Sequence, residues 1–101
     1  MKKEEVFKLF DAISQRNRIE IIKVLSDGKP KYVSEIAEKV GLSRTATSYH
    51  LDVLESVGIV EHEYQIIKEP HSVGKLGSFY KLNEEKLREA LLAIREILPQ
   101  L

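Results

Sequence analysis

The strongest constraint on the fold is a pair of short helical segments that meet at a glycine. Ser34 is predicted to cap the first segment, residues 35–40, and Gly41 to end it, because glycine adopts the left-handed conformation at low cost. Ser43 then caps the second segment. The inner row of that segment, spaced i, i+4 and i+7, consists of Thr47, Leu51 and Leu54. Two helices joined by such a tight turn predict a helix-turn-helix.

The periodicity of the sequence changes after Gly58, which ends the second of these helices. Residues 60–66 alternate between two kinds of side chain, which predicts a strand with one solvated face. The predicted inner row of the strand consists of Val60, His62, Tyr64 and Ile66. Residues 68–77 contain a proline and two glycines and are interpreted as a hairpin loop, and residues 78–82 as the returning strand. A hairpin with a basic loop after a helix-turn-helix indicates a winged helix-turn-helix.

Further helices are predicted on both sides of this unit. The first has a stripe at i, i+3, i+4 and i+7, formed by Val6, Leu9, Phe10 and Ile13. A second begins near Ser14 or Asn17 and stops at the glycine and proline of residues 27–30. The last helix is capped by Asn83 and stopped by Pro99. Its apolar row comprises Leu87, Leu91, Ile94 and Leu98.

The order of these elements, α-α-α-α-β-β-α, predicts a mainly α fold with a small β-hairpin wing. Its length fits a single domain over residues 1–101. The chain has no cysteine, which excludes disulfides, thiol catalysis and thiolate metal sites. No apolar run approaches the roughly 18–20 residues of a membrane span, and no apolar segment follows residues 1–5 to make a signal peptide. We therefore expect a cytoplasmic protein.

The charges of the chain balance to zero, but their distribution is uneven. Residues 16–31 carry a net charge of +3, residues 32–64 carry −4, and residues 65–82 carry +2. Two mildly basic segments therefore flank an acidic middle. They suit a nucleic-acid partner if the fold brings them to one face.

Several stretches of the chain resemble the ArsR-type bacterial and archaeal repressors. The clearest are Val33-Ser34-Glu35-Ile36-Ala37, Gly41-Leu42-Ser43, Ser48-Tyr49-His50-Leu51-Asp52-Val53-Leu54 and Gly58-Ile59-Val60. The similarity covers about residues 10–82, and it implies a homodimeric transcription regulator. Its first and last helices would form the dimer contacts, and its fourth helix would lie in the major groove of DNA.

The resemblance also implies where metal ions bind in some members of the family. Metal-sensing members use a cysteine pair near the third helix, or histidine and acidic ligands on the last helix. This chain has no cysteine, and residues 84–98 contain no histidine. The three histidines, His50, His62 and His71, share no ligand spacing. We therefore expect neither a metal nor another cofactor.

The fourth helix, residues 44–57, carries the candidate DNA-reading side chains near its N-terminus. Arg44 would donate two hydrogen bonds to guanine, and Thr45 or Ser48 would bond base edges or phosphate. Tyr49 would bond a phosphate or pack on a thymine methyl group. The family places phosphate or minor-groove contacts on the wing loop. The predicted DNA-binding residues are Ser43, Arg44, Thr45, Ser48, Tyr49, His50, Lys68, His71 and Lys75.

Some of these residues have an alternative structural interpretation. His50 directly precedes a core leucine and is equally well explained as a packed or hydrogen-bonded support. His62 lies on the inner row of its strand and is interpreted as structural. Arg18 is interpreted as supporting the second helix by ion pairing. The further basic candidates for DNA contact are Arg16, Arg18, Lys29 and Lys31.

The terminal helices carry more apolar surface than a small monomer needs, since Phe7 and Leu92 widen their stripes. The alternative is a thick monomer core, but a two-fold dimer is favoured. The predicted dimer interface consists of Val6, Phe7, Phe10, Leu87, Leu91, Ile94 and Leu98. Two recognition helices about one DNA turn apart (~34–36 Å) would then read an inverted repeat, and the dimer would repress by occluding promoters.

An enzyme and an interaction adaptor are the two alternatives to DNA reading. Ser48 and His50 are two positions apart on a helix and diverge, so no catalytic pair forms, and no phosphate-binding loop is present. The sequence therefore predicts no enzyme. The alternative function is a protein–protein interaction adaptor, which the zero net charge and the single arginine of the recognition helix favour. A small-molecule effector bound in an apolar cavity near the dimer helices is left open.

Overall fold

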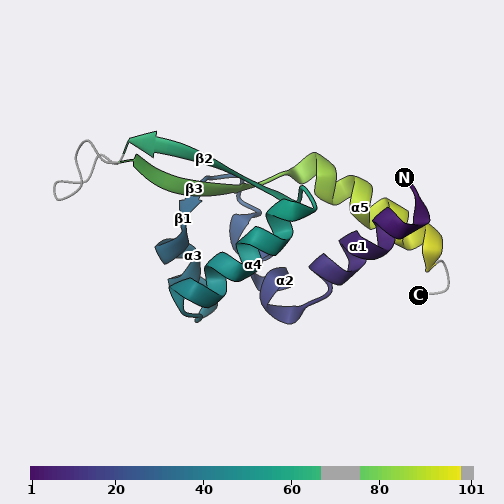
Figure 1. The fold of residues 1–101 in the computed structure, drawn as a ribbon, viewed down its shortest axis with the longest axis horizontal. Coiled ribbons are helices and arrows are strands. Elements are labelled where there is room, and N and C mark those ends of the chain that lie inside the picture. The colour runs from purple at the N-terminus through teal and green to yellow at the C-terminus, as the bar shows by residue number, and fades with distance from the viewer. Residues whose placement is uncertain (67–75, 99–101) are drawn as a thin grey trace.

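The computed structural model describes residues 1–66 and 76–98, and within them five helices pack beside a small antiparallel sheet (Figure 1). In chain order the elements are α1 (Lys3–Ile13), α2 (Arg16–Leu25), β1 (Lys31–Tyr32), α3 (Val33–Val40), α4 (Arg44–Ser56), β2 (Val60–Ile66), β3 (Leu76–Leu82) and α5 (Glu84–Ile97). This mainly helical arrangement with a β-hairpin wing confirms the predicted winged helix-turn-helix. In these described residues, no helix is both long and apolar enough to cross a membrane.

Helices α1 and α5 and the tip of the β2–β3 hairpin lie at opposite ends of an elongated molecule (Figure 1). Helices α1 and α5 lie side by side at one end, and the β2–β3 hairpin extends toward the other (Figure 1). Helices α2, α3 and α4 pack against one another in the middle. The first and last described helices are therefore available at the same end of the molecule.

The core is formed by apolar side chains from every helix and from β2 and β3. Its buried members are Leu9, Ile21, Leu25, Ile36, Leu51, Leu54, Ile59, Val60, Tyr80, Leu82 and Ala90. The predicted inner row of α4 is confirmed, because Thr47, Leu51 and Leu54 have no exposed surface. Each buried leucine or isoleucine contributes about 1.5–3 kcal/mol relative to an exposed one. Helix α4 is thus anchored along one side.

The ends of three helices form where local chemistry predicts. The Oγ of Ser43 accepts the backbone N–H of Ala46 at 3.0 Å and caps α4. The Oδ1 of Asn83 accepts the backbone N–H of Lys86 at 3.0 Å and caps α5. Gly41 ends α3 in the left-handed conformation, with φ of 72°. These three positions fix how α4 and α5 begin.

The starts of α2 and α3 differ from the prediction. Helix α2 is capped by Gln15, whose Oε1 accepts the backbone N–H of Arg18 at 3.1 Å, and not by Ser14 or Asn17. Helix α3 begins at Val33 and not after Ser34. The carboxylate of Glu35 accepts the N–H of Tyr32 at 3.0 Å and so satisfies a donor at this end. Longer side chains here replace the short caps that the sequence pattern favoured.

The sheet has a third strand that the sequence pattern did not reveal. Strand β1 is two residues long and pairs with β3, so that the strand order is β1-β3-β2. Lys31 pairs with Tyr80, and Tyr32 pairs with Phe79. Strands β2 and β3 pair antiparallel over seven residues each.

The inner row of β2 is shorter than predicted. Val60 is buried and His62 is half-buried, but Tyr64 and Ile66 are 66% and 61% exposed. This outer half of the hairpin lies at the end of the molecule away from α1 and α5 (Figure 1). Strand β3 begins at Leu76, two residues before the predicted start. Three residues of the predicted turns, Pro70, Gly74 and Pro99, lie outside the described residues.

Candidate nucleic-acid interface

The N-terminal half of α4 presents polar side chains to solvent. Arg44 and Thr45 are exposed, Ser48 is half-buried, and Tyr49 is 60% exposed. They point outward because Thr47 and Leu51, on the opposite side of the helix, are fully buried. The exposed side of this helix therefore carries donors and acceptors of the kind that read base edges and phosphates.

The turn before α4 sets the direction in which the helix leaves the core. The N–H groups of Gly41 and Leu42 both donate to the carbonyl of Ala37, at 2.9 and 3.1 Å. Ala37 is buried, so this turn is tied to the packed face of α3. Ser43 then starts α4, and its exposed position leaves the first turn of the helix open to a phosphate.

His50 occupies the support position and not the open surface. It is only 8% exposed, and its Nδ1 accepts a hydrogen bond from the Nε of Arg18 at 3.2 Å. Burial, followed by the charge of Arg18, holds the pKa of His50 below its usual range. Of the two interpretations of His50, the hydrogen-bonded support fits this geometry, since little of the ring remains open to DNA.

The partners of Arg18 differ from the expected ion pair. Besides His50, its Nη1 donates to the carbonyls of Ala12 and Asp11 at 3.2 and 3.4 Å. Its guanidinium carbon lies 6.0 Å from the centre of the Tyr49 ring. Arg18 thus supports α2 as predicted, but through α1 carbonyls and two rings of α4. No sequence pattern signals a pair of residues 32 positions apart.

The wing is fastened to α4 through His62. Its Nδ1 contacts the carboxylate of Glu55 in the second half of α4. The His62 ring also lies 5.5 Å from the ring of Tyr64 and 5.4 Å from that of Tyr80, measured between centres. This agrees with the structural role predicted for His62. The wing-loop residues Lys68, His71 and Lys75 lie outside the described residues.

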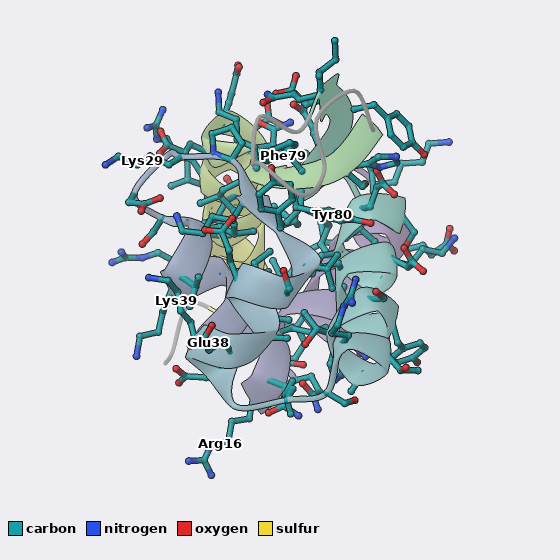
Figure 2. The ribbon with its side chains drawn as sticks, turned by 90° about the vertical axis from the view of Figure 1, so that its left-hand side faces the viewer. Arg16, Lys29, Glu38, Lys39, Phe79 and Tyr80 are labelled. Carbon is teal, nitrogen blue, oxygen red and sulfur yellow. The ribbon has the colours of Figure 1, made fainter. Side chains whose placement is uncertain are left out.

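The remaining basic candidates do not share one surface. Lys31 is 6% exposed, and its Nζ bonds both carboxylate oxygens of Asp27 at 2.6 and 2.7 Å. It is therefore unavailable to DNA, contrary to the prediction, and it holds the pKa of Asp27 below the usual range. Figure 2 shows Lys29 and Lys39 pointing away from the body on the side opposite α4, and Arg16 pointing outward below.

The predicted dimer residues lie on α1 and α5, at the end of the molecule away from the wing (Figure 1). Phe7 and Phe10 on α1 are 46% and 38% exposed, and Leu91 and Leu92 on α5 are 51% and 59% exposed. Leu87, Ile94 and Leu98 are half-buried. Val6 differs from the others, because it is 4% exposed and has little surface left for a partner.

A small apolar pocket of about 60 Å³ opens between these two helices. It is lined by Val6, Phe7, Phe10, Ile94, Ile97 and Leu98. A pocket lined by apolar side chains alone suits a hydrophobic contact better than a polar ligand.

A solvent-facing helix with a polar first half, held by a helix-turn-helix and fastened to a two-stranded wing, defines a winged helix-turn-helix DNA-binding regulator. Residues 15–62 match the family model described as bacterial regulatory protein, arsR family. The chain is therefore similar to the ArsR-type regulators over this stretch.

Solved structures of regulators agree with this assignment. The diamide-treated YodB from B. subtilis is 30% identical, with 89% of this chain and 81% of that chain covered and a TM-score of 0.59. The transcriptional repressor BigR from Xylella fastidiosa is 29% identical, with 93% and 86% covered and a TM-score of 0.66. A homodimeric winged helix-turn-helix DNA-binding domain from Mycobacterium bovis shares the fold at 22% identity, with 97% and 82% covered and a TM-score of 0.67.

These similarities support a DNA-binding transcriptional regulator, and the matched family and the solved structures are regulators and not enzymes. Within residues 1–66 and 76–98, no three histidine, cysteine or acidic side chains are grouped so as to hold an ion. The donor set that metal-sensing relatives use on the last helix is also missing from the sequence, since α5 contains no histidine. The residues present therefore do not fit a metal of that kind.

Proposed function

We propose that the chain is a homodimeric transcriptional repressor that acts in the cytoplasm and reads an inverted repeat with two copies of α4. The domain that does this is the whole of residues 1–101. The observation that carries the proposal is the solvent-facing position of Arg44, Thr45 and Tyr49 at the open end of α4. Repression follows from occupancy, because a dimer bound across a promoter excludes the polymerase.

Each reading residue has a distinct task in this proposal. Arg44, in the first turn of α4, donates to guanine O6 and N7, and Thr45 and Ser48 bond base edges or phosphate. Ser43 holds the helix end toward the backbone, where the N-terminal N–H groups favour an anion. Tyr49 bonds phosphate or packs on a thymine methyl. Lys68, His71 and Lys75 of the wing loop contact the phosphate backbone or the minor groove.

The dimer forms through the apolar side chains that α1 and α5 leave exposed. Four large ones, Phe7, Phe10, Leu91 and Leu92, are each more than one third exposed and would be covered by a second copy. Their place at the end away from the wing leaves both copies of α4 free.

The dimer is tested by replacing Phe10 or Leu91 with Ser and measuring the molecular mass by sedimentation equilibrium. The wild-type chain is expected at twice the mass of 11.6 kDa, and the variants are expected to shift toward one copy. Ile19→Ser serves as the matched control, since Ile19 is 42% exposed on α2. A wild-type chain that sediments as one copy at micromolar concentration would contradict the dimer.

DNA reading is tested by fluorescence anisotropy on genomic fragments across a salt series. Replacing Arg44 with Ala should relax the choice of sequence by about 1–3 kcal/mol. Lys39→Ala, which removes an exposed positive charge on the side opposite α4, should leave that choice unchanged. Equal binding of all fragments by the wild-type chain would contradict specific reading.

The adaptor alternative rests on the zero net charge of the chain. An adaptor of this charge should pass through a heparin or DNA column at moderate salt, whereas a reader should bind and elute as the salt concentration rises. Column retention therefore separates the two functions before any operator is known.

A further inference from the structure

One side chain of α2 connects three helices of the regulator. Arg18 donates through Nη1 to the carbonyls of Ala12 and Asp11, in the last turn of α1, at 3.2 and 3.4 Å. Through Nε it donates to His50 on α4 at 3.2 Å. The same guanidinium carbon lies 6.0 Å from the centre of the Tyr49 ring. These contacts converge on a half-buried group and not on a surface charge.

The chemistry of each contact suits a guanidinium in particular. The last carbonyls of a helix lack intrahelical donors and carry partial negative charge, so a cation there is favoured. The planar fork of arginine reaches two acceptors at once in different directions, whereas a lysine ammonium is a single point charge. His50 must be neutral to accept at Nδ1, which its burial favours.

The contacts end on the exposed surface that reads DNA. Tyr49 is 60% exposed, and its ring lies edge-to-face with His50 at 5.3 Å between centres. An exposed tyrosine ordinarily samples several rotamers, and holding it in one costs side-chain entropy. A guanidinium near the ring face and a fixed imidazole at its edge restrict that sampling before DNA arrives.

We propose that Arg18 is a positioning residue, which holds Tyr49 and the reading helix α4 in their DNA-binding arrangement relative to the dimer helix α1. The inference rests on the proposed function, because it assigns Tyr49 a DNA contact and α1 a dimer contact. Arg18 acts through His50 and Tyr49 and makes no phosphate contact of its own. It connects the surface formed by Phe7 and Phe10 with the surface that reads the operator.

The test is a double-mutant cycle on operator affinity with Arg18→Ala, Tyr49→Ala and the double variant. Arg18→Ala is expected to weaken operator binding about tenfold, a loss of the size that a hydrogen bond and a cation–π contact together supply. Tyr49→Ala should then cost at least about threefold less in the Arg18→Ala background than in the wild-type chain. Additive losses would overturn the proposal.

The salt dependence of binding separates positioning from direct contact. Each phosphate contact contributes about 0.9 to the slope of log K against log salt concentration. If Arg18 only positions other residues, the slope for Arg18→Ala should equal that of the wild-type chain. A slope smaller in magnitude by about 0.9 would indicate a lost phosphate contact and would overturn the proposal. Arg18→Lys keeps the charge but lacks Nε and the planar fork, so it should bind operator as weakly as Arg18→Ala while retaining the fold. Full affinity in Arg18→Lys would also overturn it.

A measurement on the free protein keeps this inference distinct from the proposed function. If the wild-type chain selects no DNA sequence, the proposed function fails, and the Nε–H resonance of Arg18 then decides the inference by NMR. That proton should be protected from exchange in the wild-type chain and lose its protection in His50→Ala. Equal exchange in both proteins would overturn the bridge between α2 and α4.

Discussion

The carbonyl of Ser43 accepts two hydrogen bonds from Thr47, one from the backbone N–H at 3.0 Å and one from Oγ1 at 2.8 Å. Ser43 is exposed and Thr47 is fully buried, so these bonds join the open end of the reading helix to the core. The side chain of Ser43 meanwhile caps the helix through Ala46. Ser43 thus fixes the first turn of α4 through two acceptors, its carbonyl oxygen and its Oγ.

The capping role of Ser43 predicts a graded loss of stability. Replacing it with Ala should lower the free energy of unfolding by about 1 kcal/mol, because an N–H of the first turn loses its acceptor. Ser43→Gly should lower it by only a few tenths of a kcal/mol, since glycine is tolerated at this position. Urea denaturation followed by circular dichroism measures both. A Ser43→Ala variant as stable as the wild-type chain would contradict the capping role of the Ser43 side chain.

The left-handed backbone of Gly41 predicts a cost that comes from conformation and not from crowding. A Cβ at this position would meet no atom within 4 Å, while φ is 72°. Gly41→Ala should therefore destabilise the fold by about 1–2 kcal/mol through backbone strain alone. Gly41→Asn should be milder, because asparagine visits this region more readily. Chemical denaturation of the two variants checks the order, which a packing effect would reverse because asparagine is larger.

The lowered pKa of His50 predicts that acid weakens the fold. The unfolded chain binds a proton near the ordinary pKa of 6.5, whereas the folded chain, with His50 buried beside Arg18, binds it only at lower pH. The contribution of His50 is therefore complete above pH 6.5 and is lost as the pH falls through the folded pKa. His50→Gln cannot titrate but keeps an acceptor, so its stability should fall less between pH 7 and pH 5. Thermal melts at several pH values measure the stability of the wild-type chain and of His50→Gln. Both proteins contain His62 and His71, so a difference between their pH dependences reports on His50. The same pH dependence in both would contradict the contribution of His50.

The ion pair between Lys31 and Asp27 predicts a second effect at lower pH. Lys31 holds the pKa of Asp27 below its ordinary value of 3.8, so the stability from this pair is present above that value and is lost below it. Lys31→Met should raise the pKa of Asp27 toward its ordinary value, although the backbone N–H of Lys29 still donates to the Asp27 carboxylate. Carboxyl resonances followed by NMR titration measure this directly. A pKa of Asp27 that does not move in Lys31→Met would rule out the pairing as its cause.

The parts of the fold that were predictable are those decided by local chemistry. Gly41, Ser43 and Asn83 mark helix ends because a positive φ or a short side-chain acceptor acts on neighbouring residues. The buried row of α4 follows from helical periodicity alone. The exposed part of the candidate site was therefore accessible from the sequence.

The parts that escaped prediction depend on residues far apart in the chain. Strand β1 has two residues, too few for an alternating pattern, and it exists because Tyr32 pairs with Phe79. Arg18 and His50 meet across 32 positions, so neither reveals the other in the sequence. Tyr64 follows the buried alternation of its strand but is 66% exposed, because burial depends on which other elements pack on the strand and not on its local pattern.

Selection of bound sequences from a random DNA pool tests the central claim most directly, because it reads specificity, symmetry and spacing together. The account predicts enrichment of an inverted repeat whose half-site centres are about 10–10.5 base pairs apart, or a multiple of that spacing. The same selection with Arg44→Ala should relax one position in each half-site. A pool that shows no enrichment, or that enriches only an unpaired half-site, would contradict a dimer that reads DNA with two copies of α4.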